Sequence, residues 1–421
     1  MLSPTRRVTE MKFHELGLSA GIQQAFADAG YRKPTPVQIK TIPLVLEGKD
    51  VMVAAQTGTG KTASFVAPIL DLLSVNFRRR SNQINGLILV PTRELAIQVH
   101  QSIKDYGTNS GLRSAVAYGG VKINPQMMSL RSGVHLLVAT PGRLLDLYYQ
   151  NAVKFDQLNF LVLDEADRML SLGFADEMGQ ILKVLPSKRQ TLMFSATLST
   201  QVKKLAAQLL KNPAEITISP ERIAAVKINQ WLAPVDKKRK TTLLLALLAE
   251  NRWEQALVFV NTKKGADVLA KNLTKARLST AVIHGDKSQA VRLRSLNEFK
   301  TGKSQILIGT DVASRGLDIG NLPVVINFDL PKVAKDYVHR IGRTGRANKT
   351  GEAISLVSAD EFEKLRSIEQ LLQEVIRREY VDGFDPSHEV PQSNGVPSPR
   401  KPKKPKKPQK PKKHGKSGGP G

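Results

Sequence analysis

The chain is predicted to be an α/β protein of two tandem domains, each a parallel sheet flanked by helices, followed by a disordered basic tail. Two observations predict this fold class. Short apolar, β-rich runs alternate with helix-length segments, which is typical of strands buried on both faces of a parallel sheet. The alternation occurs twice along 421 residues, a length that exceeds one ordinary core.

The expected strands divide into two sets. Between the sets, Pro213 and Pro220 interrupt a segment without helical periodicity, where we expect a hinge. This places a first domain at 1–219, the hinge at 220–226, a second domain at 227–380, and a linker with the tail at 381–421. The first set of strands is residues 51–55, 86–90, 114–118, 135–140, 160–164 and 191–197, and the second is residues 256–261, 279–284, 304–310, 324–329 and 352–358.

The sequence is strongly basic, with a net charge of +26. Ten Lys and Arg residues and no acids follow from Arg400 onward, and removing these ten leaves +16 for the first 399 residues. A basic body with a basic arm indicates a polyanionic partner, most simply nucleic acid, and the alternative is a self-repelling, soluble surface. The Lys-Pro repeats carry too little apolar surface to offset ordering entropy, so we expect an extended tail, either a nucleic-acid tether or a passive solubiliser.

Composition excludes several other classes of protein. The sequence has no cysteine, which excludes disulfides and cysteine-ligated metal and is compatible with a reducing compartment. No apolar stretch approaches the roughly twenty residues of a membrane span, and the first residues lack the apolar segment of a secretory signal. We therefore expect a cytoplasmic location and no membrane partner.

A glycine-rich segment, VMVAAQTGTGKTASF, places a turn between a strand and a helix. Gly58 and Gly60 would let backbone N–H groups converge on phosphate oxygens at the helix N-terminus. Lys61 would reach the β- and γ-phosphates, and the Thr62 hydroxyl would bind Mg²⁺. The alternative is an ordinary turn, which the flanking strand and helix disfavour. The loop consists of Ala55, Gln56, Thr57, Gly58, Thr59, Gly60, Lys61 and Thr62.

Two acids follow the buried run FLVL at the carboxyl end of an expected strand, where ligands of open α/β sheets bind. Asp164 would hold Mg²⁺, mostly through its waters, and Glu165 would polarise the attacking water. Adjacent acids after a strand are often only a solvated helix start. The phosphate loop about a hundred residues upstream favours the metal-binding interpretation.

The run Asp164-Glu165-Ala166-Asp167 resembles the signature of the DEAD-box ATP-dependent RNA helicases. Over about residues 13–381, the motifs of that family recur in the family's order, and DKKRK, IHGDKSQ and GFDP are most similar to its bacterial RhlE branch. No catalytic position departs from the family pattern. The matching segments are residues 30–38, 91–96, 140–143, 195–197, 259–262, 288–292, 310–318 and 339–346.

The resemblance implies two RecA-like domains, with ATP and Mg²⁺ as cofactors, and an enzyme that hydrolyses ATP when RNA is bound. It also implies local unwinding of short RNA duplexes, remodelling of RNA–protein complexes, and RNA contacts with little sequence specificity. Ribosomal precursors and RNA-decay machinery are partners of such enzymes. Two alternatives stay open: an ATP-gated RNA clamp or annealing chaperone, and a DNA translocase.

The resemblance also assigns nucleotide roles to individual residues. Gln38 would pair with adenine, with Phe13 and Tyr31 as candidate stacking partners, although a surface glutamine is the alternative. Asp318 would touch the ribose. In HRIGRTGR, Arg343 and Arg346 would reach the γ-phosphate from the second domain as arginine fingers.

Further positions are implied to couple the two sites and to bind RNA. Ser195 or Thr197 would hydrogen-bond to Asp167, and His339 and Arg340 would join this coupling, Arg340 through an interdomain contact. Hydroxyls, guanidinium groups and exposed N–H groups bind phosphates without reading sequence, and 2′-hydroxyl contacts would favour RNA. The implied RNA contacts are Thr92, Arg93, Gly119, Gly120, Thr140, Arg143, Thr262, Arg292 and Thr310.

Overall fold

The computed structural model describes residues 11–55, 58–76, 80–108, 110–218, 228–311, 319, 322–345 and 351–392. The expected hinge and basic tail lie outside these residues, as do Gln56, Thr57, Asp318 and Arg346. Within the described ranges, no helix combines the length and the apolar composition that crossing a membrane requires.

The first lobe is built on a seven-stranded parallel sheet with the order β3-β4-β2-β5-β6-β1-β7. All six strands expected in this half are present, and β7 is an additional, half-exposed edge strand that follows Pro213. The strands are β1 (Val51–Ala54), β2 (Ile84–Leu89), β3 (Ser114–Ala117), β4 (Val134–Ala139), β5 (Phe160–Leu163), β6 (Gln190–Ser195) and β7 (Ala214–Thr217).

Helices cover both faces of this sheet, because alternate strand residues point to opposite sides. Val162 and Phe194 belong to the core beneath α3, α4 and α5, whereas Leu163 and Met193 belong to the core beneath α7, α9 and α10. The helices are η1 (Phe13–Leu16), α2 (Ala20–Asp28), α3 (Pro36–Leu46), α4 (Lys61–Asn76), α5 (Arg93–Tyr106), α6 (Asn124–Leu130), α7 (Pro141–Tyr149), α8 (Ala166–Ser171), α9 (Ala175–Val184) and α10 (Thr200–Leu209).

The second lobe repeats the first in topology. Its strand order, β10-β11-β9-β12-β13-β8-β14, matches that of the first lobe when each strand number is raised by seven. The elements are β8 (Ile228–Pro234), η3 (Lys237–Arg239), α11 (Lys240–Asn251), β9 (Ala256–Phe259), α12 (Lys263–Lys275), β10 (Thr280–Ile283), α13 (Gln289–Lys300), β11 (Ile306–Gly309), β12 (Val324–Asn327), α15 (Ala334–Ile341), β13 (Gly351–Val357), η4 (Ala359–Glu361), α16 (Phe362–Leu372) and β14 (Arg377–Arg378).

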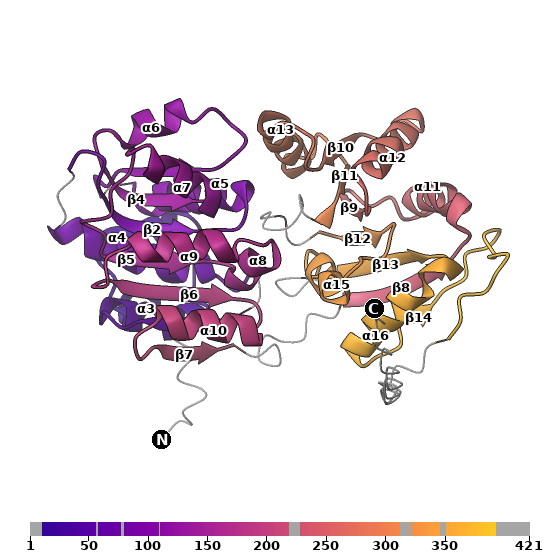
Figure 1. Ribbon diagram of the computed structural model, residues 1–421. Helices are drawn as coiled ribbons and strands as arrows, with labels where there is room; N and C mark the ends of the chain where they lie inside the picture. Colours follow the sequence, from indigo (N-terminus) through magenta and orange to yellow (C-terminus); the bar gives the residue numbers. More distant parts are fainter. Residues whose placement is uncertain are drawn as a thin grey trace, which may run out of the picture.

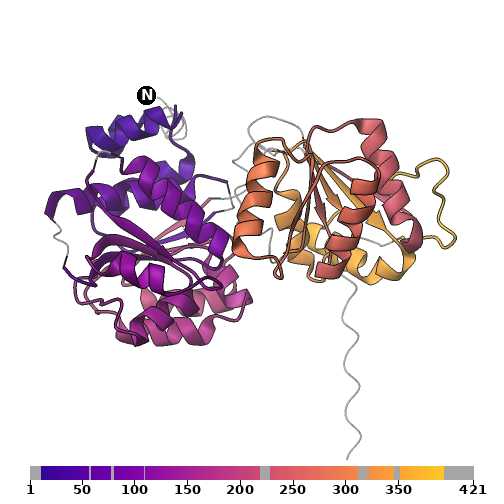
Figure 2. The ribbon, with the colours of Figure 1, turned by 90° about the horizontal axis from the view of Figure 1, so that it is seen from above.

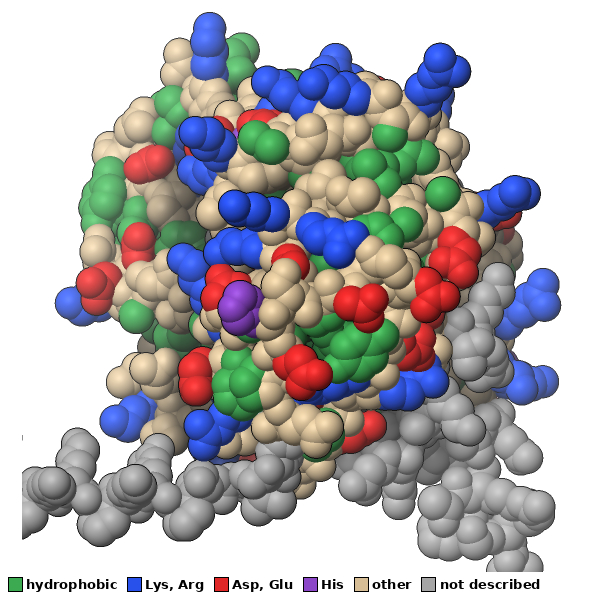
Figure 3. All heavy atoms as spheres, turned by 90° about the vertical axis from the view of Figure 1, so that its right-hand side faces the viewer, with side chains coloured by type: hydrophobic (Ala, Val, Ile, Leu, Met, Phe, Trp, Pro, Cys, Tyr) green, Lys and Arg blue, Asp and Glu red, His purple; other side chains and the backbone are tan. Residues whose placement is uncertain are grey.

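The two lobes lie side by side in both ribbon views, so two tandem α/β domains are confirmed (Figures 1 and 2). On the outer face of the second lobe, Lys and Arg side chains are spread widely, with Asp and Glu among them (Figure 3). The basic charge of the described chain is therefore distributed across this face and is not gathered in one patch there.

Residues 381–392 pack onto the second lobe. Phe384 lies beneath the Arg239 guanidinium at 4.9 Å, and Ser387 donates from its backbone N to Asp236 at 3.0 Å. Val390 is buried, and Arg378 donates to its carbonyl oxygen. The packed chain therefore continues about a dozen residues beyond the position where we expected a linker to begin.

Candidate active site

The glycine-rich loop has the backbone that phosphate binding requires. Gly58 and Gly60 have φ values of 81° and 91°, a region that other residues rarely adopt. The loop leads into the N-terminus of α4, where backbone N–H groups favour an anion. Lys61, the first residue of α4, donates from Nζ to Ala55 O at 2.7 Å, so it spans the loop beside Thr62.

Gln38 binds this loop directly. Its side chain is fully buried; Nε2 donates to Gly60 O at 3.2 Å and Oε1 accepts from Thr35 N at 2.9 Å. A Cβ on Gly60 would lie 2.6 Å from Nε2, so this close approach requires glycine. The alternative of a surface glutamine is wrong. One amide hydrogen and one oxygen lone pair have no hydrogen bond among the described residues and match the donor–acceptor pattern of an adenine edge.

Phe13 and Tyr31 pack with each other and with the domain core. Phe13 contacts Phe26 at 4.9 Å between ring centroids, and the Tyr31 hydroxyl lies 2.8 Å from that of Tyr106. The rings of Phe13 and Tyr31 stand at 90° to each other. Two perpendicular rings cannot both lie parallel to one base, so in this arrangement only one of them can stack on adenine.

Asp164 and Glu165 lie where β5 ends, next to Lys61. Burial raises the pKa of Asp164 to about 6, and the Lys61 charge opposes this rise. Burial also raises the pKa of Glu165, while the charges of Lys61 and Arg343 lower it. Glu165 has a φ of 53°, a left-handed conformation that costs roughly 1–2 kcal/mol for a residue with a Cβ. A buried carboxylate and a partly buried, strained one beside a lysine are typical of a functional site.

Hydrogen bonds join Asp167, which follows these acids in α8, to the residues at the end of β6. Thr197 Oγ1 donates to Asp167 Oδ2 at 2.8 Å, and Ala196 N donates to the other oxygen at 3.4 Å. Ser195 Oγ donates to Thr197 O at 2.7 Å and so fixes the turn. The expected contact with Asp167 is thus made by Thr197, and Ser195 supports it.

Side chains from both lobes line one cavity of about 250 Å³. Glu165, Asp167 and Thr197 reach it from the first lobe, and His339 and Arg343 reach it from α15 and the residues just after it. Arg343 is 5% exposed. Burial lowers the pKa of His339, although the charge of Asp167 raises it, and this favours the neutral imidazole. The structure therefore brings residues about 180 positions apart in sequence to one place.

Arg340 does not make the interdomain contact that we expected. It is 1% exposed, and the hydrogen bonds that it makes to described residues all lie within the second lobe. Its guanidinium binds both oxygens of Asp311 at 2.6 and 2.7 Å and stacks on the Phe259 ring at 4.9 Å. Arg340 bonds within its own lobe because it lies on the side of α15 that faces the carboxyl ends of β9, β11 and β12 rather than the first lobe.

Three of the expected RNA contacts are threonines at the N-termini of helices. Thr92 Oγ1 accepts from Leu95 N in α5 at 3.3 Å, and Thr262 Oγ1 accepts from Gly265 N in α12 at 3.0 Å. Thr140 holds the equivalent position before α7, and Thr310 is buried after β11. Hydroxyls and helix N-termini of this kind can bind phosphates.

The guanidinium groups of Arg143 and Arg292 differ from the expectation, since both are buried against protein. Arg143 donates to Val121 O at 2.9 Å and to Gln126 Oε1 at 3.0 Å, and so supports the loop of Gly119 and Gly120. Arg93 packs closely against Gly120, where a side chain would collide with it. Arg143 therefore supports the loop of Gly119 and Gly120 from its buried side.

Comparison with known families decides the class of protein. Residues 35–205 match the DEAD/DEAH box helicase family, and residues 239–348 match the helicase conserved C-terminal domain. The DEAD-box ATP-dependent RNA helicase CshA of Geobacillus kaustophilus is 41% identical over 366 residues, which cover 87% of this chain and 78% of the relative. The chain belongs to the DEAD-box family of ATP-dependent RNA helicases.

Two solved structures are similar to this helicase over most of its length. Saccharomyces cerevisiae Dbp5 bound to RNA and ADP BeF3 is 30% identical, with a TM-score of 0.78 over 89% of this chain and 97% of that one. A DEAD box protein from Methanococcus jannaschii is 38% identical, yet its TM-score is 0.53 over 88% and 99%. The better fit comes from the less similar sequence, which a shared lobe arrangement explains. The chain as a whole therefore superimposes more closely on this Dbp5 structure than on the Methanococcus jannaschii protein.

An ion pair between the lobes was missed from the sequence. Glu94, which is 2% exposed, accepts from Arg292 at 2.9 Å and from Gln289 Nε2 at 3.0 Å. Arg292, expected at the RNA backbone, thus pairs across the helicase cleft. The partners lie 195 or more residues apart in sequence, so no local pattern could have shown that they meet.

Proposed function

We propose that the helicase completes its ATPase site only when the lobes close. The first lobe supplies the phosphate loop, Lys61, Asp164 and Glu165, and the second supplies Arg343 and Arg346. The observation that carries this proposal is the burial of Arg343 in a cavity shared with Glu165. A guanidinium there would neutralise charge that develops on the γ-phosphate, an effect worth about 10³–10⁵ in rate in related systems.

We propose Mg²⁺ as the ion bound with ATP, held by Asp164 and Thr62. Burial raises the pKa of Asp164, and a divalent cation beside this carboxylate would restore its charged form. Within the described ranges, no group of three or more His, Asp or Glu side chains gathers as a metal cage. Phosphate oxygens and water would therefore complete the coordination, as is usual for Mg²⁺.

Glu165 is the proposed group that orients the attacking water. The ionised carboxylate is the stronger acceptor for a hydrogen bond from water, and the charges of Lys61 and Arg343 favour that form against burial. Because Arg343 comes from the second lobe, closure both completes the anion site and favours ionised Glu165. Gln38 would select adenine, and Asp318 would contact the ribose.

The RNA surface is proposed to run along the helix N-termini of both lobes. Thr92, Thr140 and Thr262, with Thr310, Arg93 and the backbone of Gly119 and Gly120, would bind phosphates and leave the sequence unread. Arg143 and Arg292 would act indirectly. Arg143 would support the loop of Gly119 and Gly120, and Arg292 would stabilise the closed state by pairing with the other lobe. ATP and RNA would then favour the same closed state, each increasing the affinity for the other.

Glu165→Gln and Arg343→Ala test this division of labour. Both should abolish most RNA-stimulated ATP hydrolysis while ADP affinity stays within about twofold, since neither group is needed for the diphosphate. A loss that lies wholly in ADP affinity would contradict the finger role of Arg343. Full hydrolysis by Glu165→Gln would remove the proposed role of that carboxylate.

The alternative, an ATP-gated RNA clamp or annealing chaperone, is favoured by the basic arm. Strand displacement measured with a nonhydrolysable ATP analogue distinguishes the two. Displacement of a short duplex should require ATP, and displacement that is unchanged with the analogue would favour the chaperone. Stimulation of hydrolysis by RNA but not by single-stranded DNA would set aside a DNA translocase.

The cellular assignments are finer proposals. We place the protein in the cytoplasm, where ATP and RNA are both present, with ribosomal precursors or RNA-decay machinery as partners. We also place it nearest the RhlE branch. Two of the supporting segments pack together, since Arg239 of DKKRK stacks on Phe384 of GFDP. Crosslinking to RNA in cells, followed by sequencing, tests the choice of partner.

A further inference from the structure

A lysine–glutamate ion pair is buried in the second lobe, away from every residue placed above in the ATP or RNA site. Lys240 is 2% exposed and Glu361 is 5% exposed, and their charged groups bind each other. Burying two charges is costly unless both are hydrogen-bonded, and the pair seldom stabilises a fold more than apolar residues would. Its contacts therefore need an explanation other than stability.

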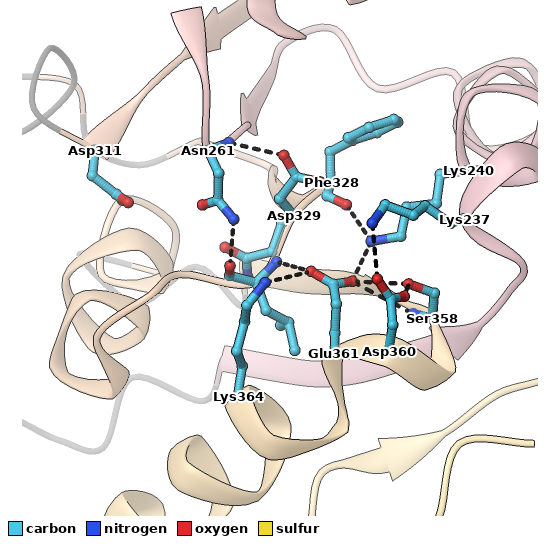
Figure 4. Close-up of polar contacts among 12 residues, drawn as sticks. Lys237, Lys240, Asn261, Asp311, Phe328, Asp329, Ser358, Asp360, Glu361 and Lys364 are labelled. Atoms are coloured by element: carbon cyan, nitrogen blue, oxygen red, sulfur yellow. Dashed lines mark hydrogen bonds and ion pairs between the residues drawn. The ribbon is translucent and has the colours of Figure 1, made fainter.

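The pair holds one side of the turn at residues 328–330, which follows β12. Lys240 Nζ donates to Phe328 O at 2.8 Å, and Glu361 Oε1 accepts from Leu330 N at 3.2 Å. Figure 4 shows Phe328 and Asp329 between this pair on one side and Asn261 on the other. Lys240 and Glu361 thus hold the main chain of the turn on this side, one by its carbonyl oxygen and the other by its N–H group.

The other side of the same turn is bound by Arg340. Its Nη1 donates to Asp329 O at 2.6 Å, and Asn261 joins Arg340 Nη2 at 3.3 Å to Leu330 O at 2.9 Å. With Asp311 and Asn327, Arg340 makes five hydrogen bonds, equal to the number of N–H groups in a guanidinium. A displacement of the turn would therefore disrupt the bond from Arg340 to Asp329 and the link through Asn261.

Arg340 in turn fixes the position of the expected finger. Arg343 N donates to Arg340 O at 3.1 Å, and Leu322 N donates to Arg343 O at 3.2 Å. Arg343 leaves the end of α15 within one turn of Arg340, and its side chain lines the cavity shared with Glu165.

We propose that the Lys240–Glu361 pair is a positioning element for Arg343, acting through the turn at 328–330 and through Arg340. The proposal rests on the role of Arg343 proposed above. It predicts that loosening the pair moves the guanidinium and lowers the rate of hydrolysis, although neither Lys240 nor Glu361 touches the nucleotide.

The test is the paired substitution Lys240→Met with Glu361→Leu, which leaves no unpaired buried charge. We expect kcat for RNA-stimulated hydrolysis to fall about 10–100-fold, as small misplacements of catalytic groups do, with ADP and RNA affinities within about twofold. Glu361→Gln, which keeps the side-chain volume, should give a smaller loss in the same direction. The matched control is Lys237→Met with Asp360→Leu, an exposed pair at 2.8 Å beside it, which should leave kcat unchanged.

A double-mutant cycle separates positioning from general loosening. In the Arg343→Ala background, the paired substitution should lower single-turnover hydrolysis by no more than about twofold, because the group it positions is already gone. The same large loss in both backgrounds, or no loss in the native background, overturns the inference. If Arg343→Ala alone leaves hydrolysis unchanged, the finger assignment itself is wrong, which is a different result.

Discussion

The two lobes share one strand order but use it differently, and the lysine after their first strand shows how. In the first lobe β1 leads to α4, which begins at Lys61; in the second β8 leads to η3 and then α11, which begins at Lys240. Lys61 follows two glycines with positive φ, whereas no glycine lies between β8 and Lys240.

What lies opposite each lysine differs too. Lys61 faces Asp164 and Glu165 across a loop whose N–H groups can receive phosphate. Lys240 binds Glu361, a carboxylate of the protein itself, from the 3-10 helix just after β13. In the second lobe, a carboxylate of the protein thus lies where the first lobe is proposed to bind a phosphate. On these proposals, the same strand order supports a ligand site in one lobe and an internal ion pair in the other.

The largest expected effect comes from replacing lysine by methionine, in separate variants, at Lys61 and at Lys240. Lys61→Met should lower ATP hydrolysis by about 10²–10³-fold or more, since it removes a cation aimed at the phosphates. Lys240→Met should lower it less, because it acts only through position. Hydrolysis rates of the two variants, measured side by side with RNA, would break the comparison if Lys240→Met proved the more severe.

The free energy of unfolding should change in the opposite order, with the larger loss in Lys240→Met. Lys240→Met leaves Glu361 buried without its partner and should reduce the free energy of unfolding by about 3–5 kcal/mol. Both tryptophans, Trp231 and Trp253, lie in the second lobe, so tryptophan fluorescence in urea reports on that lobe alone. Adding Glu361→Leu should recover most of the loss. A single variant as stable as the native chain would mean that the pair contributes no brace.

Local sequence features of the fold and the site could be predicted, whereas contacts that depend on packing could not. The phosphate loop and Asp164 are local features, with glycines, lysine and acids at fixed spacing after apolar runs, and every expected strand is present. Contacts made by packing were not predictable. Glu361 meets Lys240 across 121 residues, and Arg340 was assigned to the wrong neighbours because its side of α15 depends on the fold.

Strand detection failed for a related reason. β7 and β14 lie at the edge of their sheets, one half-exposed and the other two residues long, so neither carries a continuous apolar run. β8 mixes polar residues with a terminal Pro234 and is only partly buried over its first three residues. Only the sheet that it joins shows that it is the counterpart of β1.

A third prediction concerns the stability of the unliganded ATP site. The pKa of Asp164 is raised to about 6 by burial, so the folded state prefers the proton and the ionised carboxylate costs about 2–3 kcal/mol at neutral pH. Asp164→Asn should therefore stabilise the nucleotide-free protein by that order while it abolishes hydrolysis.

The sign of this effect can be checked against pH. The gain from Asp164→Asn should be full above about pH 6 and should vanish below about pH 4, where native Asp164 is protonated in both states. Asp360→Asn is the control of opposite sign, because hydrogen bonds from Lys237 and Ser358 lower the pKa of Asp360 to about 2. Calorimetric melting temperatures of both variants across pH test this, and a constant gain for Asp164→Asn would contradict it.

The smallest effect on hydrolysis is expected from the chain beyond both lobes. Deleting residues 400–421 removes ten positive charges and no residue of either site. Turnover at saturating RNA should stay within about twofold, while RNA affinity falls and its dependence on salt becomes shallower by about 0.7 for each phosphate that the tail had neutralised. A tail of equal length with Gln in place of Lys and Arg is the control for chain length. If deletion leaves the salt slope unchanged, the tail does not hold RNA, and the charge that does so belongs to the lobes.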